Sequence, residues 1–334
     1  MKLITHLTNI RYLIGFTGTY GFMLLGKKNY FFTDFRYRGF AEELQRSKTR
    51  IPFKFIELNK DFEQTFKKLA ARSLEFEADH LTIQELQGWK KRFKGISFKA
   101  LKKSIEDQRF IKDTEEIKNL KKSQRINEET LKRLQKLFKP GVSELELAWQ
   151  VKAIGHELGA EDISFEPIIA FGAHSATPNH QNSNTKLKAG DVVLVDMGMK
   201  YKGYCSDMTR TFFTKKPTAE QEDVYFKVLT AQEDAIKALK AGVKCAKLDE
   251  ISRTSMGDDD AAHFGHSLGH GIGLDVHEAP NLSSRSKDTL KENMIVTVEP
   301  GIYLPGRFGV RIEDMGRVTK TGYENFTRAE KLNQ

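Results

Sequence analysis

The sequence predicts two domains that each mix helices and strands, a small α/β unit followed by a larger α+β domain. The 334 residues fit two domains at ~150 residues each. Strand-like runs alternate with turns and a helical pattern over the first ~80 residues. A long, highly charged helical stretch separates them from a second half with apolar strands of its own. The boundary is expected near residues 105–115, which gives domains 1–110 and 111–334.

The first domain is expected to begin with a series of short strands. The runs IRYLIGF, FMLLG and NYFFTD are rich in aromatic and branched residues and are bounded by turn residues, which predicts three strands. A helical stretch follows from Arg38 to Arg46, and IPFKFIEL is predicted as a further strand.

The segment TEEIKNLKKSQRINEETLKRLQKLF has apolar residues at helical spacing in a charged setting, which predicts one long helix or two short ones. Asp113 and Thr114 are suited to cap its start, and Lys139-Pro140-Gly141 is expected to stop it. Beyond it, DVVLVDMG, DMTRTFF and MIVTVEP are expected as strands. The run AEQEDVYFKVLTAQEDAIKAL is expected as a helix.

The composition excludes several classes of protein. No apolar run approaches the ~18 residues of a membrane helix, and MKLITHLTNIRYL interrupts its apolar positions too often for a signal peptide. Cys205 and Cys245 are the two cysteines, too few for a disulfide framework or a paired-cysteine zinc site. A cytoplasmic protein with reduced thiols is therefore expected.

The net charge of +9 is concentrated in one stretch, because Lys90 to Lys139 contains 17 Lys and Arg against 7 Asp and Glu. Such a stretch is compatible with nucleic-acid binding. Neither interleaved aromatic residues nor a nucleic-acid-binding motif accompanies it. A solvated linker and helix face is therefore the favoured interpretation.

Two pairs of acidic residues carry the first indication of chemistry. Asp196 ends an apolar run and Asp207 follows ten residues of hairpin-like sequence; a symmetric turn centred between residues 201 and 202 would place the two carboxylates directly opposite each other. Glu299 and Glu313 repeat the pattern around Pro305-Gly306. Like charges that face each other need a proton or a cation between them, and an intervening cation explains both pairs.

Histidines add nitrogen ligands to this set. His270 lies between glycines, which allow close approach of a ligand, and His263, His266 and His277 crowd the same fifteen residues. Four carboxylates and one imidazole suit Mn²⁺, Co²⁺, Fe²⁺ or Zn²⁺. Their four negative charges would balance two divalent cations.

The motifs VDMG, SDMTRT, HSLGHGIGLDVHE, TVEPGIY and VRIED resemble, in this order, those of the M24 "pita-bread" metallopeptidases. This family includes Xaa-Pro aminopeptidase, prolidase and methionine aminopeptidase. The N-terminal runs TNIRYLIGFTGTYGFMLL and FFTDFRYRGFAEE are similar to the creatinase-type N-terminal domain of its proline-directed members. The resemblance thus implies a pita-bread catalytic domain preceded by a smaller creatinase-type domain.

Carried over by position, the resemblance implies two divalent metal ions, with Mn²⁺ as the first choice and Co²⁺, Zn²⁺ or Fe²⁺ as alternatives. It implies five metal ligands, two of them shared between the ions, and a hydroxide held by both ions as the nucleophile. Glu299 would also relay a proton, His266 and His277 would hold substrate, and Arg311 would support a metal-side carboxylate or the substrate. An ordinary ion pair of His277 with Glu278 is the simpler alternative. The implied ligands are Asp196, Asp207, His270, Glu299 and Glu313.

The sequence departs from the family at one loop position. Family members carry a histidine after Ser-Ala-x-Pro, where this chain has Asn179 followed by His180. A one-residue shift of the loop would bring His180 into the catalytic role, and this is the favoured interpretation; otherwise an amide replaces the imidazole. Cys205 is expected to be a packed side chain and not a ligand.

The resemblance implies a Xaa-Pro aminopeptidase that removes an N-terminal residue preceding proline, and a homodimer. Prolidase, which cleaves only Xaa-Pro dipeptides, is the alternative. A non-catalytic M24-like binding protein is less favoured because all five ligands are present, and a creatinase-type hydrolase does not need this ligand set. The expected partners are peptides with proline at the second position, with no membrane and no nucleic acid.

Overall fold

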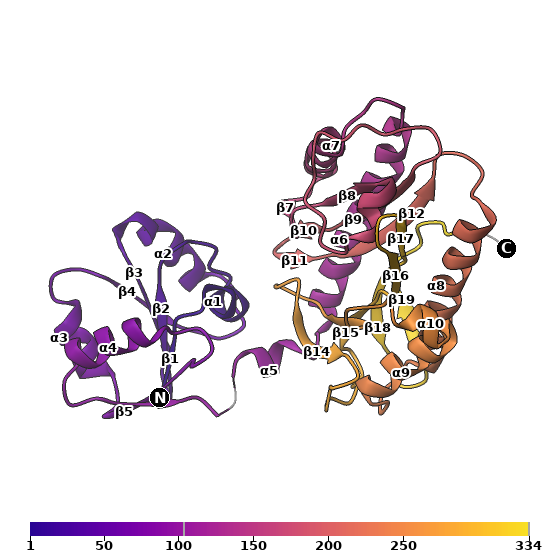
Figure 1. Cartoon of the computed structure of the whole chain (residues 1–334). Helices are drawn as coiled ribbons and strands as arrows, with labels where there is room; N and C mark the ends of the chain where they lie inside the picture. The colour runs from indigo at the N-terminus through magenta and orange to yellow at the C-terminus, as the bar shows by residue number, and fades with distance from the viewer. Residues whose placement is uncertain (103, 333–334) are drawn as a thin grey trace. The chain divides into compact units, whose positions relative to one another are not determined.

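The computed structural model describes residues 1–102 and 104–332 (Figure 1). The chain divides into two compact units, Met1–Arg109 and a second that begins at Phe110. Among the described residues, the helices are all too short or too polar to cross a membrane.

The first unit is built on a six-stranded mixed sheet in the order β4-β3-β2-β1-β5-β6. Phenylalanines fill one side of this sheet: Phe22 and Phe32 stack at 4.8 Å, and Phe66 packs on Phe93 at 4.2 Å. The strands are β1 (Lys2–Ile4), β2 (Phe22–Leu25), β3 (Tyr30–Thr33), β4 (Lys54–Glu57), β5 (Ser73–Phe76) and β6 (Ser97–Ala100); the helices are α1 (Leu7–Ile14), α2 (Arg38–Arg46), α3 (Phe62–Leu69), α4 (Ile83–Arg92) and α5 (Glu106–Arg109), with a 3-10 turn η1 (Phe35–Tyr37).

The run IRYLIGF is not the predicted strand, because α1 spans most of it. Ile10, Leu13 and Ile14 are buried at helical spacing, and a short apolar run of this kind cannot be distinguished from a strand by its pattern alone. Gly15 ends the helix at a φ of 79°, a conformation that glycine adopts readily. The other predicted strands, FMLLG, NYFFTD and IPFKFIEL, and the helix Arg38–Arg46 are confirmed.

The second unit begins with the predicted charged helix, which is one long element, α6 (Thr114–Leu134), followed by a 3-10 turn, η2 (Gln135–Leu137). The Asp113 side chain accepts hydrogen bonds from the backbone N–H groups of Glu115 and Glu116, and the Glu116 carboxylate accepts one from the backbone N–H of Asp113. This capping box satisfies N–H groups that have no partner within the helix.

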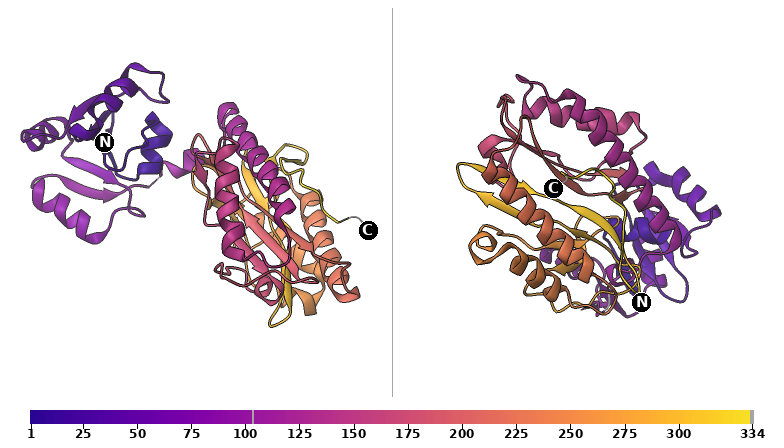
Figure 2. Two further views of the ribbon diagram at one scale, coloured as in Figure 1. Left: turned by 90° about the horizontal axis from the view of Figure 1, so that it is seen from above. Right: turned by 90° about the vertical axis from the view of Figure 1, so that its right-hand side faces the viewer.

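Helices cover the outer sides of several small sheets in this unit (Figure 2). Helices α6 and α7 (Glu144–Glu157) pack with β8 (Ile168–Phe171) and β9 (Val192–Met197), whereas α8 (Ala219–Ala238) and α9 (Cys245–Met256) pack with β15 (Ile295–Val298) and β17 (Phe308–Arg311). The remaining elements are β7 (Asp162–Ile163), η3 (Gly172–Ala176), β10 (Met199–Tyr201), β11 (Tyr204–Cys205), β12 (Met208–Phe213), α10 (Asp258–Ala261), β13 (Gly269–Gly271), β14 (Glu278–Leu282), β16 (Gly301–Leu304), β18 (Asp314–Val318) and β19 (Tyr323–Asn325).

The sheets of this unit are ordered β12-β9-β8, β11-β10-β7, β14-β13-β15-β18-β19 and β16-β17. The predicted strands DVVLVDMG, DMTRTFF and MIVTVEP correspond to β9, β12 and β15, and the predicted helix corresponds to α8. Each of these elements is therefore confirmed.

The turn of the first acidic hairpin is centred one residue later than predicted, which shifts the strand register by two residues. Its turn is formed by Lys202 and Gly203, both at positive φ (48° and 82°), so its centre lies between residues 202 and 203. Two-residue turns with positive φ at both positions match the twist of paired strands. Asp196 is consequently opposite Thr209, and Asp207 precedes β12.

The second acidic hairpin has the predicted centre. Gly301 pairs with Arg311 and Leu304 with Phe308, which centres the turn on Gly306, at a φ of 74°. Glu299 directly follows β15, and Glu313 lies between β17 and β18, so both flank this hairpin.

Replacing Asp113 by alanine is expected to lower the free energy of unfolding by about 1 kcal/mol, because the α6 N-terminus loses its capping carboxylate. Asp113→Asn keeps an acceptor oxygen and serves as the matched control. Chemical denaturation of both variants measures the difference. An alanine variant as stable as the asparagine variant would show that the cap does not stabilise this helix.

Candidate metal centre

The five acidic and histidine residues implied as ligands line one cavity of about 620 Å³ in the second unit. They come from five places: β9 carries Asp196, the segment before β12 carries Asp207, β13 carries His270, and the ends of β15 and β17 are followed by Glu299 and Glu313. The cavity therefore lies where the strand ends of several sheets converge.

His270 is central to this group. Its Nε2 atom is 3.3 Å from Glu299 Oε1 and 3.7 Å from Asp207 Oδ2. Asp207, His270 and Glu313 each offer a ligand atom within 4.8 Å of the other two. The ring Nδ1 of His270 is 3.0 Å from the backbone oxygen of Gly271, which suits a proton on Nδ1 and leaves Nε2 free as a ligand.

Three carboxylate oxygens in this group are buried and have no hydrogen-bond partner among the described residues: Asp196 Oδ1, Asp207 Oδ1 and Glu313 Oε1. An unsatisfied buried oxygen is costly, and a charged one more so. A cation between these oxygens would satisfy all three. The donor set therefore fits divalent metal ions.

Charge repulsion has a clear effect on the carboxyl groups. Burial, together with the neighbouring carboxylates, raises the pKa of Asp207 and of Glu313 well above the usual range. Burial also raises the pKa of Asp196, although the Arg311 guanidinium opposes this. For Glu299 the effect of burial is outweighed by the hydrogen bond and charge of His270, which lower its pKa.

Arg311 holds the metal-side carboxylate in place. Its Nη2 atom donates to Asp196 Oδ2 at 2.5 Å, Nε donates to the Thr209 hydroxyl at 3.0 Å, and Nη1 donates to the Tyr303 hydroxyl at 2.8 Å. Thr209 in turn donates to Glu313 Oε2 at 2.8 Å. Arg311 thus contacts three side chains around the cavity, which it also lines.

His266 and His277 also line the cavity. Nε2 of His266 is 2.8 Å from the hydroxyl of Tyr303, and burial lowers the pKa of His266. The ring of His277 lies edge-on to that of His270 at 4.5 Å, and burial also lowers its pKa. Both rings are therefore neutral at neutral pH. Glu278, the simpler partner considered for His277, forms a buried ion pair with Lys112 at 2.9 Å.

The loop after η3 does not bring His180 into the cavity, so the favoured loop shift is not found. Nε2 of His180 is 2.9 Å from Glu144 Oε2, and His174 contacts the other oxygen of the same buried carboxylate at 2.8 Å. Asn179 lines the cavity in its place. Because Glu144 anchors His180, Asn179 and not His180 lines the cavity.

Sequence reasoning did not identify Glu144, Thr209 or Tyr303. Glu144 accepts hydrogen bonds from the backbone of Phe171 and Ser183, so it fixes the loop that carries Asn179. Glu144 is far from this loop in the sequence, and no sequence pattern links the two, so the contact could not be predicted. Cys205 is buried as expected, and burial raises the pKa of its thiol to about 11.

Comparison with known proteins bears directly on this site. The sequence profile of "Metallopeptidase family M24" matches residues 118–320, and that of the "Creatinase/Prolidase N-terminal domain" matches residues 1–111. The chain belongs to metallopeptidase family M24. The implied creatinase-type domain and pita-bread fold are thereby confirmed, and the protein is a metallopeptidase whose family implies divalent metal ions.

Three relatives of this chain are similar to it over most of their length. A Xaa-Pro dipeptidase of Pyrococcus horikoshii is 34% identical over 86% of this chain and 82% of its own length. The structure of a Xaa-Pro dipeptidase from Bacillus anthracis is 36% identical, with a TM-score of 0.93 over 99% of this chain and 93% of that one. The X-Pro aminopeptidase from Thermotoga maritima is 31% identical, with a TM-score of 0.90 over 99% and 96%.

The variant Asp207→Asn is expected to stabilise the metal-free protein at pH 8, raising Tm by about 3 °C, because it removes one of the mutually repelling carboxylates. Carboxyl groups with raised pKa values destabilise the fold when ionised and cease to do so once protonated. The advantage of the variant should therefore shrink as the pH falls from 8 to 5. Thermal unfolding after chelation measures it.

The same experiment with added Mn²⁺ provides the control. Metal should raise the Tm of the wild-type protein well above that of the metal-free form and should stabilise Asp207→Asn far less. A metal-free variant that is less stable than wild type, or a difference that does not depend on pH, would contradict the electrostatic account.

Asn179→Ala is expected to lower kcat on a proline-containing peptide about tenfold with unchanged metal content, because the cavity loses a hydrogen-bond donor. His180→Ala should instead lower the free energy of unfolding by about 1–2 kcal/mol, since buried Glu144 loses a partner. Kinetics, metal analysis and denaturation measure these effects. Normal stability with a tenfold loss of kcat in His180→Ala would restore His180 as the catalytic residue.

Proposed function

We propose that this protein is a Xaa-Pro dipeptidase, a prolidase, that uses two divalent metal ions. The observation that carries the proposal is the set of buried carboxylate oxygens without partners, together with His270, around a single cavity. Two of the three relatives described above are Xaa-Pro dipeptidases, and one of these has the higher TM-score of the two solved structures, 0.93 against 0.90. This favours the dipeptidase over the Xaa-Pro aminopeptidase that the sequence analysis placed first.

The proposed ligand assignment follows the family resemblance and is consistent with the distances found. Asp196, Asp207, His270, Glu299 and Glu313 would together hold the two ions. The four negative charges of the carboxylates balance two divalent cations. Mn²⁺ is the first choice for this oxygen-rich ligand set. When bound, such ions activate water and polarise a scissile carbonyl group.

The side chains around the ligands have distinct proposed tasks. The lowered pKa of Glu299 keeps it ionised at neutral pH, so it can accept a proton from the attacking water and pass it to the departing proline nitrogen. His266 and His277 are neutral and can donate hydrogen bonds to the substrate and to the developing oxyanion. Arg311 would hold the Asp196 carboxylate in place.

The cavity has walls suited to a proline residue. Phe165, Ile168 and Val276 contribute apolar surface beside the polar groups, and apolar walls with a few placed polar groups are typical of small-molecule sites. Asn179 would supply an uncharged donor where family members use an imidazole. An amide cannot transfer a proton at neutral pH, so its contribution would be orientation alone.

The binding-protein alternative receives little support from the basic stretch. Arg92, Lys121 and Arg133 contact Glu63, Glu324 and Glu129, as expected for a solvated, ion-paired surface. A homodimer and a cytoplasmic location stay predictions. Sedimentation of the purified chain tests the first.

The deciding assay compares a Xaa-Pro dipeptide with the Xaa-Pro-Xaa tripeptide of matched sequence, using Mn²⁺-supplied protein and a chelated control. We expect kcat/KM on the dipeptide to exceed that on the tripeptide at least tenfold, and chelation to abolish both activities. Glu299→Gln should lose at least a hundredfold in kcat.

Equal or faster cleavage of the tripeptide would establish the aminopeptidase instead. Failure to cut either peptide, with two ions bound per chain, would contradict the proposal. In that case Asn179→His is the matched variant, because it restores the titratable donor of the family without touching a ligand.

A further inference from the structure

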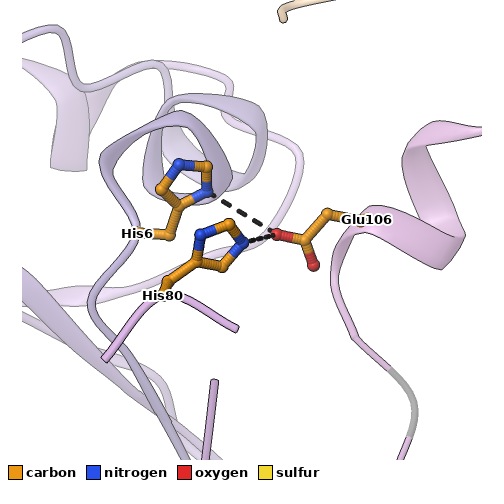
Figure 3. Close-up of side chains that lie close together, drawn as sticks. All are labelled: His6, His80 and Glu106. Atoms are coloured by element: carbon orange, nitrogen blue, oxygen red, sulfur yellow. Dashed lines mark hydrogen bonds and ion pairs between the residues drawn. The ribbon is translucent and has the colours of Figure 1, made fainter. Parts of the chain in front are cut away.

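Side chains of metal-ligating types also gather in the first unit, which contains none of the five implied M24 ligands. The group consists of His6, which precedes α1, His80, which lies before α4, and Glu106, which begins α5 (Figure 3). All three belong to the unit Met1–Arg109. Each offers a ligand atom within 4.8 Å of the other two, although they are far apart in the sequence.

The two imidazoles are arranged as a pair. Their rings are stacked, with centroids 3.7 Å apart and planes within 2° of parallel. His80 Nε2 is 2.6 Å from Glu106 Oε1, and His6 Nδ1 is 3.6 Å from the same oxygen (Figure 3). Two nitrogens from separate segments thus face one carboxylate. If both stacked imidazoles were protonated, their positive charges would repel each other.

Two atoms of this cluster are buried without a hydrogen-bond partner among the described residues, His6 Nδ1 and Glu106 Oε2. The contact of 3.6 Å between His6 and Glu106 is too long for a hydrogen bond. Buried polar atoms in folded proteins are normally satisfied by protein, water or an ion. One nitrogen and one oxygen are therefore available as ligands without loss of an existing bond.

Neighbouring groups hold the cluster in position. Asn9 Nδ2 donates to Glu106 Oε1 at 2.5 Å and to Glu77 Oε1 at 2.6 Å. The other oxygen of Glu77 accepts the backbone N–H groups of Thr5 and His6 at 2.7 and 2.9 Å. Such outer contacts orient ligands before a metal ion binds.

The carboxylate is ionised at neutral pH. Burial raises the pKa of Glu106, but His6, Asn9 and His80 outweigh it, and the pKa lies well below its usual range. A divalent ion would thus meet one negative charge and two nitrogen donors. His80 also lines an open cavity of about 750 Å³, which gives an ion access and leaves space for water as a further ligand.

We propose that His6, His80 and Glu106 bind one divalent ion of borderline hardness, with Zn²⁺ as the representative. Two imidazole nitrogens and one carboxylate oxygen form a common zinc ligand set, with metal–ligand distances of ~2.0–2.2 Å and ligand atoms therefore ~3.4 Å apart. The His6–Glu106 separation already matches this value. The shorter His80–Glu106 contact lengthens when the proton between them is displaced by the ion.

The ion would join three segments of the first unit that are distant in the sequence. Glu106 lies three residues before the end of this unit at Arg109. Bound metal would therefore fix the last segment of the unit to the segments that carry His6 and His80. The expected consequence is a more stable first unit.

The test is the number of Zn²⁺ ions bound by the full-length chain, measured by mass spectrometry of the metal after chelation, reloading and equilibration at buffered micromolar free Zn²⁺. His80→Ala and His6→Ala should each bind one ion fewer than wild type. His156→Ala, which removes an exposed histidine on α7, should bind the wild-type number. Because the readout is a difference from wild type, it does not depend on the ions at the M24 residues.

A second measurement uses the unaltered protein, in case a variant folds poorly. Diethylpyrocarbonate modifies accessible imidazole nitrogens, and peptide mass spectrometry reports each histidine separately. Zn²⁺ should reduce the modification rate of His80 at least fivefold and leave that of His156 unchanged.

The site is supported if His6→Ala and His80→Ala each bind one Zn²⁺ ion fewer than wild type and if Zn²⁺ protects His80 from modification. Equal metal content in wild type, His6→Ala and His80→Ala, or modification of His80 at the same rate with and without Zn²⁺, would overturn it. The cluster would then be a hydrogen-bonded pair of histidines sharing one carboxylate.

Discussion

The central constraint on this molecule is the burial of like charges in the second unit. Asp196, Asp207 and Glu313 each keep a buried oxygen without a partner among the described residues, and burial with mutual repulsion raises their pKa values. An arrangement of this kind is unfavourable for the protein alone. Divalent cations held by these residues would make it favourable, which would couple folding stability to metal binding in this unit.

The backbone around the cavity serves this arrangement. The Lys202-Gly203 turn sets Asp196 opposite Thr209 and leaves Asp207 just before its strand, so the two carboxylates converge from staggered and not directly facing positions. The Thr209 hydroxyl accepts a hydrogen bond from Arg311 and donates one to Glu313, so the positions of these two side chains depend on each other. One hydroxyl thereby orders carboxylates that come from two different sheets.

The sequence predicted the chemistry of the site better than its geometry. Apolar strands that end in acidic residues revealed Asp196 and Glu313, because a carboxylate there requires compensation. The predicted turn centre of the first hairpin was wrong by one residue because the dihedral angles of Lys202 decide it, and neighbouring residues do not reveal them. His180 could not be placed because its position depends on Glu144, which is remote in the sequence. The run containing Ile10 proved helical, an ambiguity inherent in short apolar segments.

Anomalous X-ray diffraction from crystals grown with Mn²⁺ tests the central claim most directly, because it locates the ions without relying on activity. Two strong peaks are expected in the cavity, within coordination distance of Asp196, Asp207, His270, Glu299 and Glu313. Crystals that contain Mn²⁺ elsewhere but show no peak among these carboxylates at neutral pH would contradict it.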